Sequence, residues 1–370
     1  MNSTLEKDAV DIRRWNGHGN RRRLLKATLA TGLASLFPGS FAYAADEKTA
    51  TAHGFGFRMI ETNGIKMRIV EQGTGPLVLL VHGFPESWYS WRHQISVLAN
   101  AGYRVIAPDM RGYGQTDSPK AIEAYTIIEL VNDLTGLLDK LGEKTSTIVG
   151  HDFGAVVSWN ACLLHPDRFT AIAALSVPYS PRRESPPLAT LRQLMGGRFF
   201  YIDYFQNPGV ADAELNQDVG KTLRALFFTA SAEGDLMRGR NSAPVRKYLD
   251  SLIDMGKPPS WLTTEDFDYY VTEFERSGFT GGLNWYRNLD RNWELMAAYQ
   301  NARITVPAVF ITGAEDPVQR QTKPNFDVLP DMVPGLTKRL VLKNCGHWTQ
   351  QERPHEVNAE LLQFLKGVTA

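Results

Sequence analysis

The sequence predicts an α/β protein with a largely parallel central sheet, interrupted once by a helical insertion. From about residue 57, short β-branched runs alternate with longer segments of helical periodicity, the pattern of strands joined by crossover helices. This alternation stops between about residues 178 and 302, a stretch rich in Phe, Tyr and Trp. The composition, with 43% hydrophobic and 22% charged residues, is typical of a chain that folds around a sizeable core.

The strands and their connecting helices can be placed in order along the chain. The expected strands are residues 67–71, 77–82, 103–108, 145–150, 170–177, 305–312 and 340–342. The run at 77–82 is continuously apolar, as in a strand buried on both faces. Leucines recur at helical spacing from Leu130 to Leu141 and predict an amphipathic crossover helix, and residues 356–365 predict a closing helix.

The insertion divides the expected core into two parts. Residues 45–178 form its first part, residues 179–302 a helical lid over the carboxyl edge of the sheet, and residues 303–370 its second part. Pro181, Pro186 and Pro187 mark the point where the lid departs from the core.

The first 44 residues are interpreted as an export signal that is not part of the fold. Arg21 and Arg22 precede a leucine pair and a lysine, which resembles the twin-arginine signal, and Ala42-Tyr43-Ala44 is an A-x-A cleavage site. The apolar stretch between them is shorter than the roughly 20 residues that a membrane-spanning helix needs. We therefore expect cleavage near Ala44 and export, giving a periplasmic or secreted protein without a stable membrane anchor.

Charge and cysteine content exclude several functional classes. Lys plus Arg equals Asp plus Glu at 40 each, so no bulk positive charge favours nucleic-acid binding. The two cysteines, Cys162 and Cys345, cannot form a disulfide scaffold. The sequence contains no Walker loop, no dinucleotide-binding glycine fingerprint and no clustered metal ligands, and we expect neither a cofactor nor a metal.

The strongest chemical signal is Gly150-His151-Asp152-Phe153-Gly154, which lies between an expected strand and an expected helix. A G-x-nucleophile-x-G sequence in this context predicts a nucleophile elbow, in which a sharp turn presents the central side chain above the sheet edge. Serine is the usual central residue. Asp152 is instead ionised near neutral pH and needs no base to attack an sp³ carbon, which would give an alkyl ester that water must hydrolyse. The alternative is an aspartate that only caps the following helix.

Two loops at other strand ends supply the expected partners of Asp152. The backbone amides of Phe84, in His82-Gly83-Phe84-Pro85, and of Phe153 are candidates for an oxyanion hole. His347 follows the last expected strand and is the candidate general base. Asp316, in preference to Glu315, is its expected orienting carboxylate. The order nucleophile, acid, histidine is that of the α/β-hydrolase fold.

These motifs resemble the α/β-hydrolase-fold epoxide hydrolases along nearly the whole chain after residue 44. The resemblance lies in HGFPESWYSWRHQ at 82–94, DMRGYGQTD at 109–117, GHDFGA at 150–155 and CGHWTQ at 345–350. It implies two lid tyrosines that protonate the epoxide oxygen: YIDYFQNPG at 201–209 places one at Tyr201, and NWYRN at 284–288 places the other at Tyr286. Possible substitutes are Tyr204, Tyr269 and Tyr270, and the alternative role of every lid tyrosine is aromatic packing.

The resemblance implies hydrolysis of a small apolar epoxide by water to a vicinal diol, through an ester on Asp152. Trp285 and Trp348 are expected to line the substrate pocket. A dehalogenase of the same fold is the main alternative, but a departing halide needs N–H donors, and Phe153 stands where a donating tryptophan is common. A binding protein built on a hydrolase scaffold is less favoured, because it would not need a complete nucleophile, acid and base.

Overall fold

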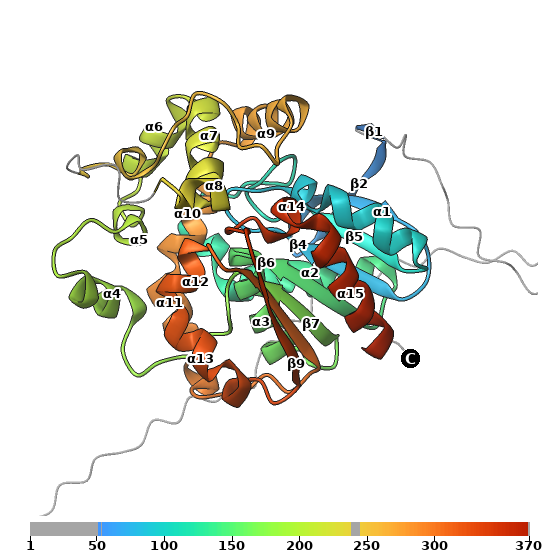
Figure 1. Ribbon diagram of the computed structural model, residues 1–370. Helices are drawn as coiled ribbons and strands as arrows, with labels where there is room; N and C mark the ends of the chain where they lie inside the picture. The colour runs from blue at the N-terminus through green and yellow to red at the C-terminus, as the bar shows by residue number, and fades with distance from the viewer. Residues whose placement is uncertain (1–50, 53, 238–244, 369–370) are drawn as a thin grey trace, which may run out of the picture. The chain divides into compact units, whose positions relative to one another are not determined.

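The computed structural model describes residues 51–52, 54–237 and 245–368 (Figure 1). The predicted export signal lies outside these residues. Nine strands form one sheet in the order β1-β2-β3-β5-β4-β6-β7-β8-β9. They are β1 Thr51–Ala52, β2 Phe55–Thr62, β3 Ile65–Gln72, β4 Leu77–Val81, β5 Arg104–Pro108, β6 Ser146–His151, β7 Phe169–Leu175, β8 Ala308–Gly313 and β9 Leu336–Leu342. In the sheet order β5-β4-β6-β7-β8-β9, every pair of neighbouring strands is parallel. This confirms the predicted α/β class with a mostly parallel sheet.

The first part of the sheet is antiparallel and contains a strand that the sequence analysis overlooked. β2 pairs with β3 through a two-residue turn at Asn63-Gly64, where φ is 43° and 76°. Positive φ at both positions is the geometry of a tight hairpin, for which Asn-Gly is the preferred sequence. The turn signal was therefore present in the sequence, next to the strand expected at residues 67–71.

The core helices pack in pairs on the sheet, α1 against α15 and α2 against α3. α2 shows why its segment is helical: the Thr126 side chain caps its first turn, Gly142 ends it in the left-handed conformation, and its leucines are buried. The helical elements of the core are η1 Trp88–Trp91, α1 Arg92–Asn100, η2 Ile122–Tyr125, α2 Ile127–Leu141, α3 Phe153–Leu164, α12 Pro317–Gln321, α13 Lys323–Met332, α14 Thr349–Glu352 and α15 Pro354–Val368.

Between β7 and β8 the described residues form helices and add no strand to the sheet. Figure 1 shows most of these helices gathered at the upper left, at one end of the sheet. They are α4 Pro187–Met195, α5 Tyr201–Tyr204, α6 Val210–Asn216, α7 Val219–Ala230, α8 Ala232–Asp235, η3 Leu249–Ser251, α9 Thr264–Ser277, α10 Thr280–Arg287, α11 Leu289–Leu295 and η4 Ala297–Tyr299. We call this segment the lid. Its limits at residues 179 and 302, like those of the other predicted domains, stay a prediction.

Two further observations concern the whole described chain. Among its helices, none combines the length and the apolar character that crossing a membrane requires. Cys162 and Cys345 are both buried with free thiols.

Candidate active site

Asp152 lies in the sharp turn that joins strand β6 to helix α3. Its backbone has φ 53° and ψ −122°, a conformation that costs free energy for a residue with a side chain. The glycines on both sides explain how the turn closes: a Cβ on Gly150 would overlap the backbone of Gly154, and a Cβ on Gly154 would overlap the carbonyl groups of Val81 and His82. Only glycine fits at either position, so the local sequence forces the carboxylate out above the sheet edge.

The carboxylate of Asp152 has a different partner on each oxygen. Oδ1 accepts a hydrogen bond of 2.9 Å from the backbone N–H of Phe84, and the Phe153 N–H also donates to the carboxylate. Oδ2 lies 3.2 Å from Nε2 of His347. Both amides predicted as an oxyanion hole thus donate to the carboxylate, with Phe84 on Oδ1, and Oδ2 faces the predicted base.

His347 lies between two carboxylates. Its Nδ1 is 3.1 and 3.2 Å from the two oxygens of Asp316, which also accepts the Val318 N–H at the start of α12. Asp316 is fully buried and His347 is only 3% exposed. Glu315, the less favoured candidate for the carboxylate that orients His347, instead accepts a hydrogen bond from the backbone N–H of Cys345.

The loop that carries His347 is fixed by its own backbone. The His347 carbonyl oxygen accepts hydrogen bonds from Ser176 Oγ and His151 Nε2, both of 2.7 Å, while its N–H donates to the carbonyl of Ala230 in the lid. The other ring nitrogen of His151 binds the buried carboxylate of Glu86 at 2.7 Å. Glu86 was not predicted as a site residue, although it ends the His-Gly-Phe-Pro-Glu sequence.

The charges of this cluster shift the pKa values of its members. Burial alone would raise the pKa of Asp152, but the hydrogen bond and the charge of His347 lower it below its usual value. Burial would lower the pKa of His347, yet the Asp316 carboxylate first and Asp152 second raise it well above its usual value. Both shifts favour the aspartate–imidazolium form of the pair in the free site.

A cavity of about 360 Å³ opens directly above Asp152 and His347. Tyr201 and Tyr286, from lid helices α5 and α10, both line it, with their ring centroids 6.1 Å apart. Burial, followed by the charge of Asp152, raises the pKa of both hydroxyls above the usual value for tyrosine. All five predicted catalytic side chains are thus brought together in one place, and both predicted oxyanion donors point at Asp152.

Comparison with known proteins agrees with this geometry. Residues 76–354 match the family model of the alpha/beta hydrolase fold. Over 315 residues, which cover 84% of this chain and 97% of the relative, the sequence is 50% identical to epoxide hydrolase A of Mycobacterium tuberculosis. Among solved structures, that of epoxide hydrolase A from Mycobacterium thermoresistibile is 50% identical with a TM-score of 0.81, over 85% of this chain and 99% of that one. An epoxide hydrolase from an endophytic Streptomyces is 47% identical with a TM-score of 0.82, over 85% and 96%.

The chain belongs to the α/β-hydrolase-fold epoxide hydrolases. The resemblance drawn from the sequence motifs is thereby confirmed for the fold and for the family.

The two tryptophans predicted to line the pocket of this epoxide hydrolase have different places. Trp348 lines the catalytic cavity, and its Nε1 donates to the Phe227 carbonyl at 2.9 Å. Trp285 is not among the residues that line the cavity; it is fully buried, with its Nε1 donating to the carbonyl of Arg111 at 3.2 Å and its ring edge-on to Phe153. Trp285 packs under the site and does not border its space.

One cavity residue, Tyr248, escaped the sequence analysis. Its ring lies 5.6 Å from that of Tyr201, and it lines the cavity of the epoxide hydrolase together with the two predicted tyrosines. The three substitutes considered from the sequence line no part of this cavity: Tyr204 bonds Glu214, Tyr269 accepts from Trp88, and Tyr270 donates to Gln351. No motif indicates Tyr248, because its contacts with the rings of Tyr201 and Phe205, far away in the sequence, bring it to the site.

The described residues were also searched for metal sites. No group of three or more His, Cys, Asp or Glu side chains within residues 51–52, 54–237 and 245–368 is arranged to hold a metal ion.

Proposed function

We propose that this enzyme opens its epoxide in two covalent steps, with Asp152 as nucleophile and His347 as general base. The observation that carries the proposal is that the two oxygens of one carboxylate have different partners: Oδ1 accepts from the Phe84 amide, while Oδ2 lies against His347, and Asp152 lines the cavity. A carboxylate whose pKa is lowered is fully ionised near neutral pH, and it is presented at a fixed angle to the substrate.

In the first step, Asp152 Oδ2 attacks an epoxide carbon and the C–O bond of the ring breaks. The electron pair moves to the ring oxygen, which takes a proton from Tyr201 or Tyr286. The charge of Asp152 is one of the causes that hold the pKa of both hydroxyls up, and this charge disappears as the ester forms. The tyrosines therefore become stronger acids as the alkoxide develops, which favours proton transfer in the transition state.

In the second step, His347 removes a proton from water and the resulting hydroxide attacks the carbonyl carbon of the ester. Conversion of Asp152 to an ester removes one of the two carboxylates that raise the pKa of His347, so the imidazolium becomes more acidic. It returns its proton to the tyrosinate left by the first step, which restores the tyrosine hydroxyl and leaves the neutral imidazole that acts as base. The amides of Phe84 and Phe153 stabilise the tetrahedral oxyanion. When it collapses, the ester C–O bond breaks and the leaving diol oxygen takes the proton from His347. The Asp152 carboxyl group then gives its proton to His347, which restores the carboxylate and the imidazolium.

A variant that stops after the first step tests this proposal. His347→Gln should form the ester from styrene oxide but hydrolyse it at least about 10²-fold more slowly, because glutamine cannot act as a base. Intact-protein mass spectrometry should show a single adduct equal to the mass of the epoxide, mapped to the peptide with Asp152. The double variant Asp152→Ala/His347→Gln is the matched control and should remain unmodified. An adduct in the double variant, or none in His347→Gln under conditions where styrene oxide binds, would contradict the proposed mechanism.

The cavity favours an epoxide over a haloalkane as substrate. Halide departure needs free N–H donors, but the indole N–H groups of Trp348 and Trp285 both bind backbone carbonyls, and Phe153 has no side-chain donor. Tyrosine hydroxyls, in contrast, match the basic oxygen of an opened epoxide. With about 360 Å³ and leucine, isoleucine and aromatic side chains among its walls, the cavity fits a small apolar epoxide.

We further propose that residues 1–44 direct export by the twin-arginine route, with cleavage near Ala44 and a periplasmic or secreted enzyme as the result. The support is the sequence itself: seven Lys or Arg against three Asp or Glu, the paired Arg21-Arg22, and a short apolar stretch before the A-x-A motif. Replacement of Arg21 and Arg22 by lysine should leave uncleaved precursor in the cytoplasm. Normal export of this variant, measured by cell fractionation, would reject the proposal.

A further inference from the structure

Glu352 lies in the short helix α14, directly after the loop that carries His347. Its carboxylate accepts hydrogen bonds from three backbone amides: those of Gly346 and Ala232 donate to Oε2, each at 3.0 Å, and that of Trp348 donates to Oε1 at 3.1 Å. Gly346 and Trp348 are the two neighbours of His347 in the chain, and Ala232 begins the lid helix α8. One carboxylate therefore binds the backbone on both sides of His347 and ties it to the lid.

The lid and the loop that carries His347 also touch through their backbones. The His347 N–H donates to the Ala230 carbonyl at 2.8 Å. A Cβ on Gly346 would overlap the lid backbone from residue 230 to residue 232, so only glycine allows this approach. Ala230 also lines the catalytic cavity. The backbone position of His347 is thus set by contacts with the lid as well as with the core.

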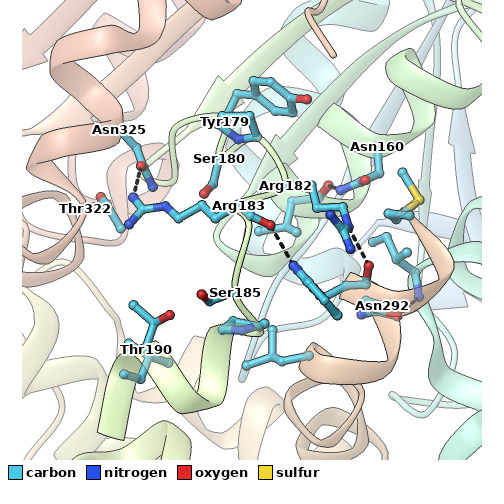
Figure 2. Close-up of a pocket in the computed structure, with 18 of the residues that line it drawn as sticks. Asn160, Tyr179, Ser180, Arg182, Arg183, Ser185, Thr190, Asn292, Thr322 and Asn325 are labelled. Atoms are coloured by element: carbon cyan, nitrogen blue, oxygen red, sulfur yellow. Dashed lines mark hydrogen bonds between the residues drawn. The ribbon is translucent and has the colours of Figure 1, made fainter. Parts of the chain in front are cut away.

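Glu352 borders neither space beside the nucleophile. It is not among the residues that line the catalytic cavity, nor among those of the neighbouring cavity of about 400 Å³, to whose wall Phe153 contributes. Figure 2 shows part of this neighbouring cavity, with Asn160 of α3 and Asn292 of α11 in its wall. Glu352 therefore has no contact with a substrate in either space, and it can act on the reaction only through the groups that it binds.

A charged carboxylate is costly to keep at this place. Burial raises the pKa of Glu352 to about 7 in spite of its three amide donors, and the nearby charge of Asp316 acts in the same direction. A neutral side chain of the same shape would avoid this cost, but the amide group of a glutamine has only one acceptor oxygen. What glutamine cannot reproduce is therefore the binding of backbone amides by both oxygens at once.

We propose that Glu352 is a positioning residue, which holds the backbone on both sides of His347 and couples this loop to the lid. The inference rests on the proposed role of His347 as general base. The imidazole must keep its place beside Asp316 after Asp152 has become an ester, because it then orients a water toward the ester carbonyl carbon. Ester formation uses Asp152 and the lid tyrosines, so it depends much less on Glu352 than ester hydrolysis does.

Glu352→Gln tests the proposal, because it keeps the shape of the side chain and removes one of its two acceptor oxygens. In single-turnover experiments with styrene oxide, ester hydrolysis should slow about tenfold or more, while ester formation stays within about twofold of the wild-type rate. In the steady state, kcat should therefore fall more than kcat/KM. A general loss of folded enzyme would instead lower both in equal proportion.

Glu315→Gln is the matched control. Glu315 accepts the amide of Cys345, and the single acceptor oxygen of glutamine can still bind that one donor. The variant thus removes a negative charge beside Asp316 without releasing an amide of the loop. Both ester formation and ester hydrolysis should keep their wild-type rates.

Ser231→Ala tests the lid side of the contact with a smaller change. The Ser231 hydroxyl accepts the Gly234 N–H at 3.3 Å at the start of α8, which fixes the turn that presents the Ala232 amide to Glu352. Without this hydroxyl, ester hydrolysis should slow about threefold, with ester formation unchanged.

The outcomes separate this inference from the proposed function. If His347→Gln traps no ester, the proposed role of His347 fails. If His347→Gln traps the ester but Glu352→Gln hydrolyses it at the wild-type rate, only the role of Glu352 is overturned. Equal slowing of both steps in Glu352→Gln, or equal slowing of hydrolysis in Glu352→Gln and Glu315→Gln, would also overturn it, because either result would indicate a general loss of structure or charge. Should Glu352→Gln fail to fold, an unchanged rate of ester hydrolysis in Ser231→Ala would overturn the coupling to the lid.

Discussion

The core and the lid contribute to the same cavity but hold their side chains in different ways. The core groups lie at strand ends and are held by hydrogen bonds between backbone and side chain. The Phe84 N–H donates to the Asp152 carboxylate, and the Ser176 hydroxyl donates to the His347 carbonyl. Tyr201 belongs to α5, a four-residue helix without a buried residue, and its position depends on ring contacts such as that with Phe205. The proposed mechanism thus places the covalent chemistry on groups held by hydrogen bonds, and proton donation on a part positioned by side-chain packing.

Within the lid, Tyr286 is held more firmly than Tyr201. Its helix α10 has six buried residues and touches the core at Gly281, which packs directly on the backbone of Gly112. Its carbonyl accepts a hydrogen bond from Gln206 of the lid. Tyr286 and Tyr201 should therefore differ in how much each increases the rate of ester formation, and variants of the two residues test that difference.

The largest effect is expected when both donors are lost. The double variant Tyr201→Phe/Tyr286→Phe leaves a strongly basic alkoxide without an acid, so ester formation should slow by about 10⁴-fold. Tyr286→Phe alone should be slower than Tyr201→Phe, because the remaining Tyr201 sits on the less constrained helix. Single-turnover formation of the Asp152 ester measures this step, with Tyr204→Phe as a control outside the cavity. Equal rates in the two single variants would refute the assigned difference between α5 and α10.

Sequence motifs located the core half of this site well, because each lies directly after a predicted strand. Parallel strands bring Phe84, Asp152, Asp316 and His347 to one edge of the sheet, so their proximity followed from the order of elements. Tyr201 and Tyr286 came from a family resemblance and not from periodicity. Their convergence depends on how helices far apart in sequence pack.

What the sequence did not reveal shares this non-local origin. Tyr248 reaches the cavity by packing on Tyr201 and Phe205, and no short-range pattern encodes that contact. Trp285 was expected to line the pocket, yet it does not border the cavity, and its indole N–H donates to the backbone carbonyl of Arg111. Only β2 was overlooked despite a local signal, the Asn63-Gly64 turn.

The contact between α10 and the core offers a second, smaller test of the comparison. In Gly281→Ala, the new Cβ would overlap the backbone of Gly112, which cannot move aside as a flexible side chain could. We expect the free energy of unfolding to fall by about 1–3 kcal/mol, with slower ester formation because Tyr286 is displaced. Gly220→Ala in α7 is the matched control: its Cβ meets only ordinary contacts at 3.6 and 4.0 Å, so stability should be unchanged or slightly raised. Urea unfolding of both variants measures the free energy of unfolding. An unchanged value in Gly281→Ala would contradict the tight contact between Gly281 and Gly112.

The last prediction concerns how the rates of ester formation and ester hydrolysis depend on pH. The groups that titrate in the tested range belong to the core, while the lid tyrosines do not titrate there. The pKa values of Tyr201 and Tyr286 lie above their usual value, so neither titrates below about pH 10. Ester formation needs ionised Asp152, whose pKa is lowered, and should stay constant down to about pH 5. Ester hydrolysis needs neutral His347, whose pKa Asp316 still raises in the ester. Its rate should therefore fall about tenfold per pH unit below that pKa and level off above it. Stopped-flow measurement should give a flat pH profile for ester formation and a profile that rises with pH for ester hydrolysis.

Tyr201→Phe should lower the rate of ester formation without changing the shape of either pH profile. A shifted midpoint of the hydrolysis profile in that variant would mean that the lid takes part in the titration assigned to the core.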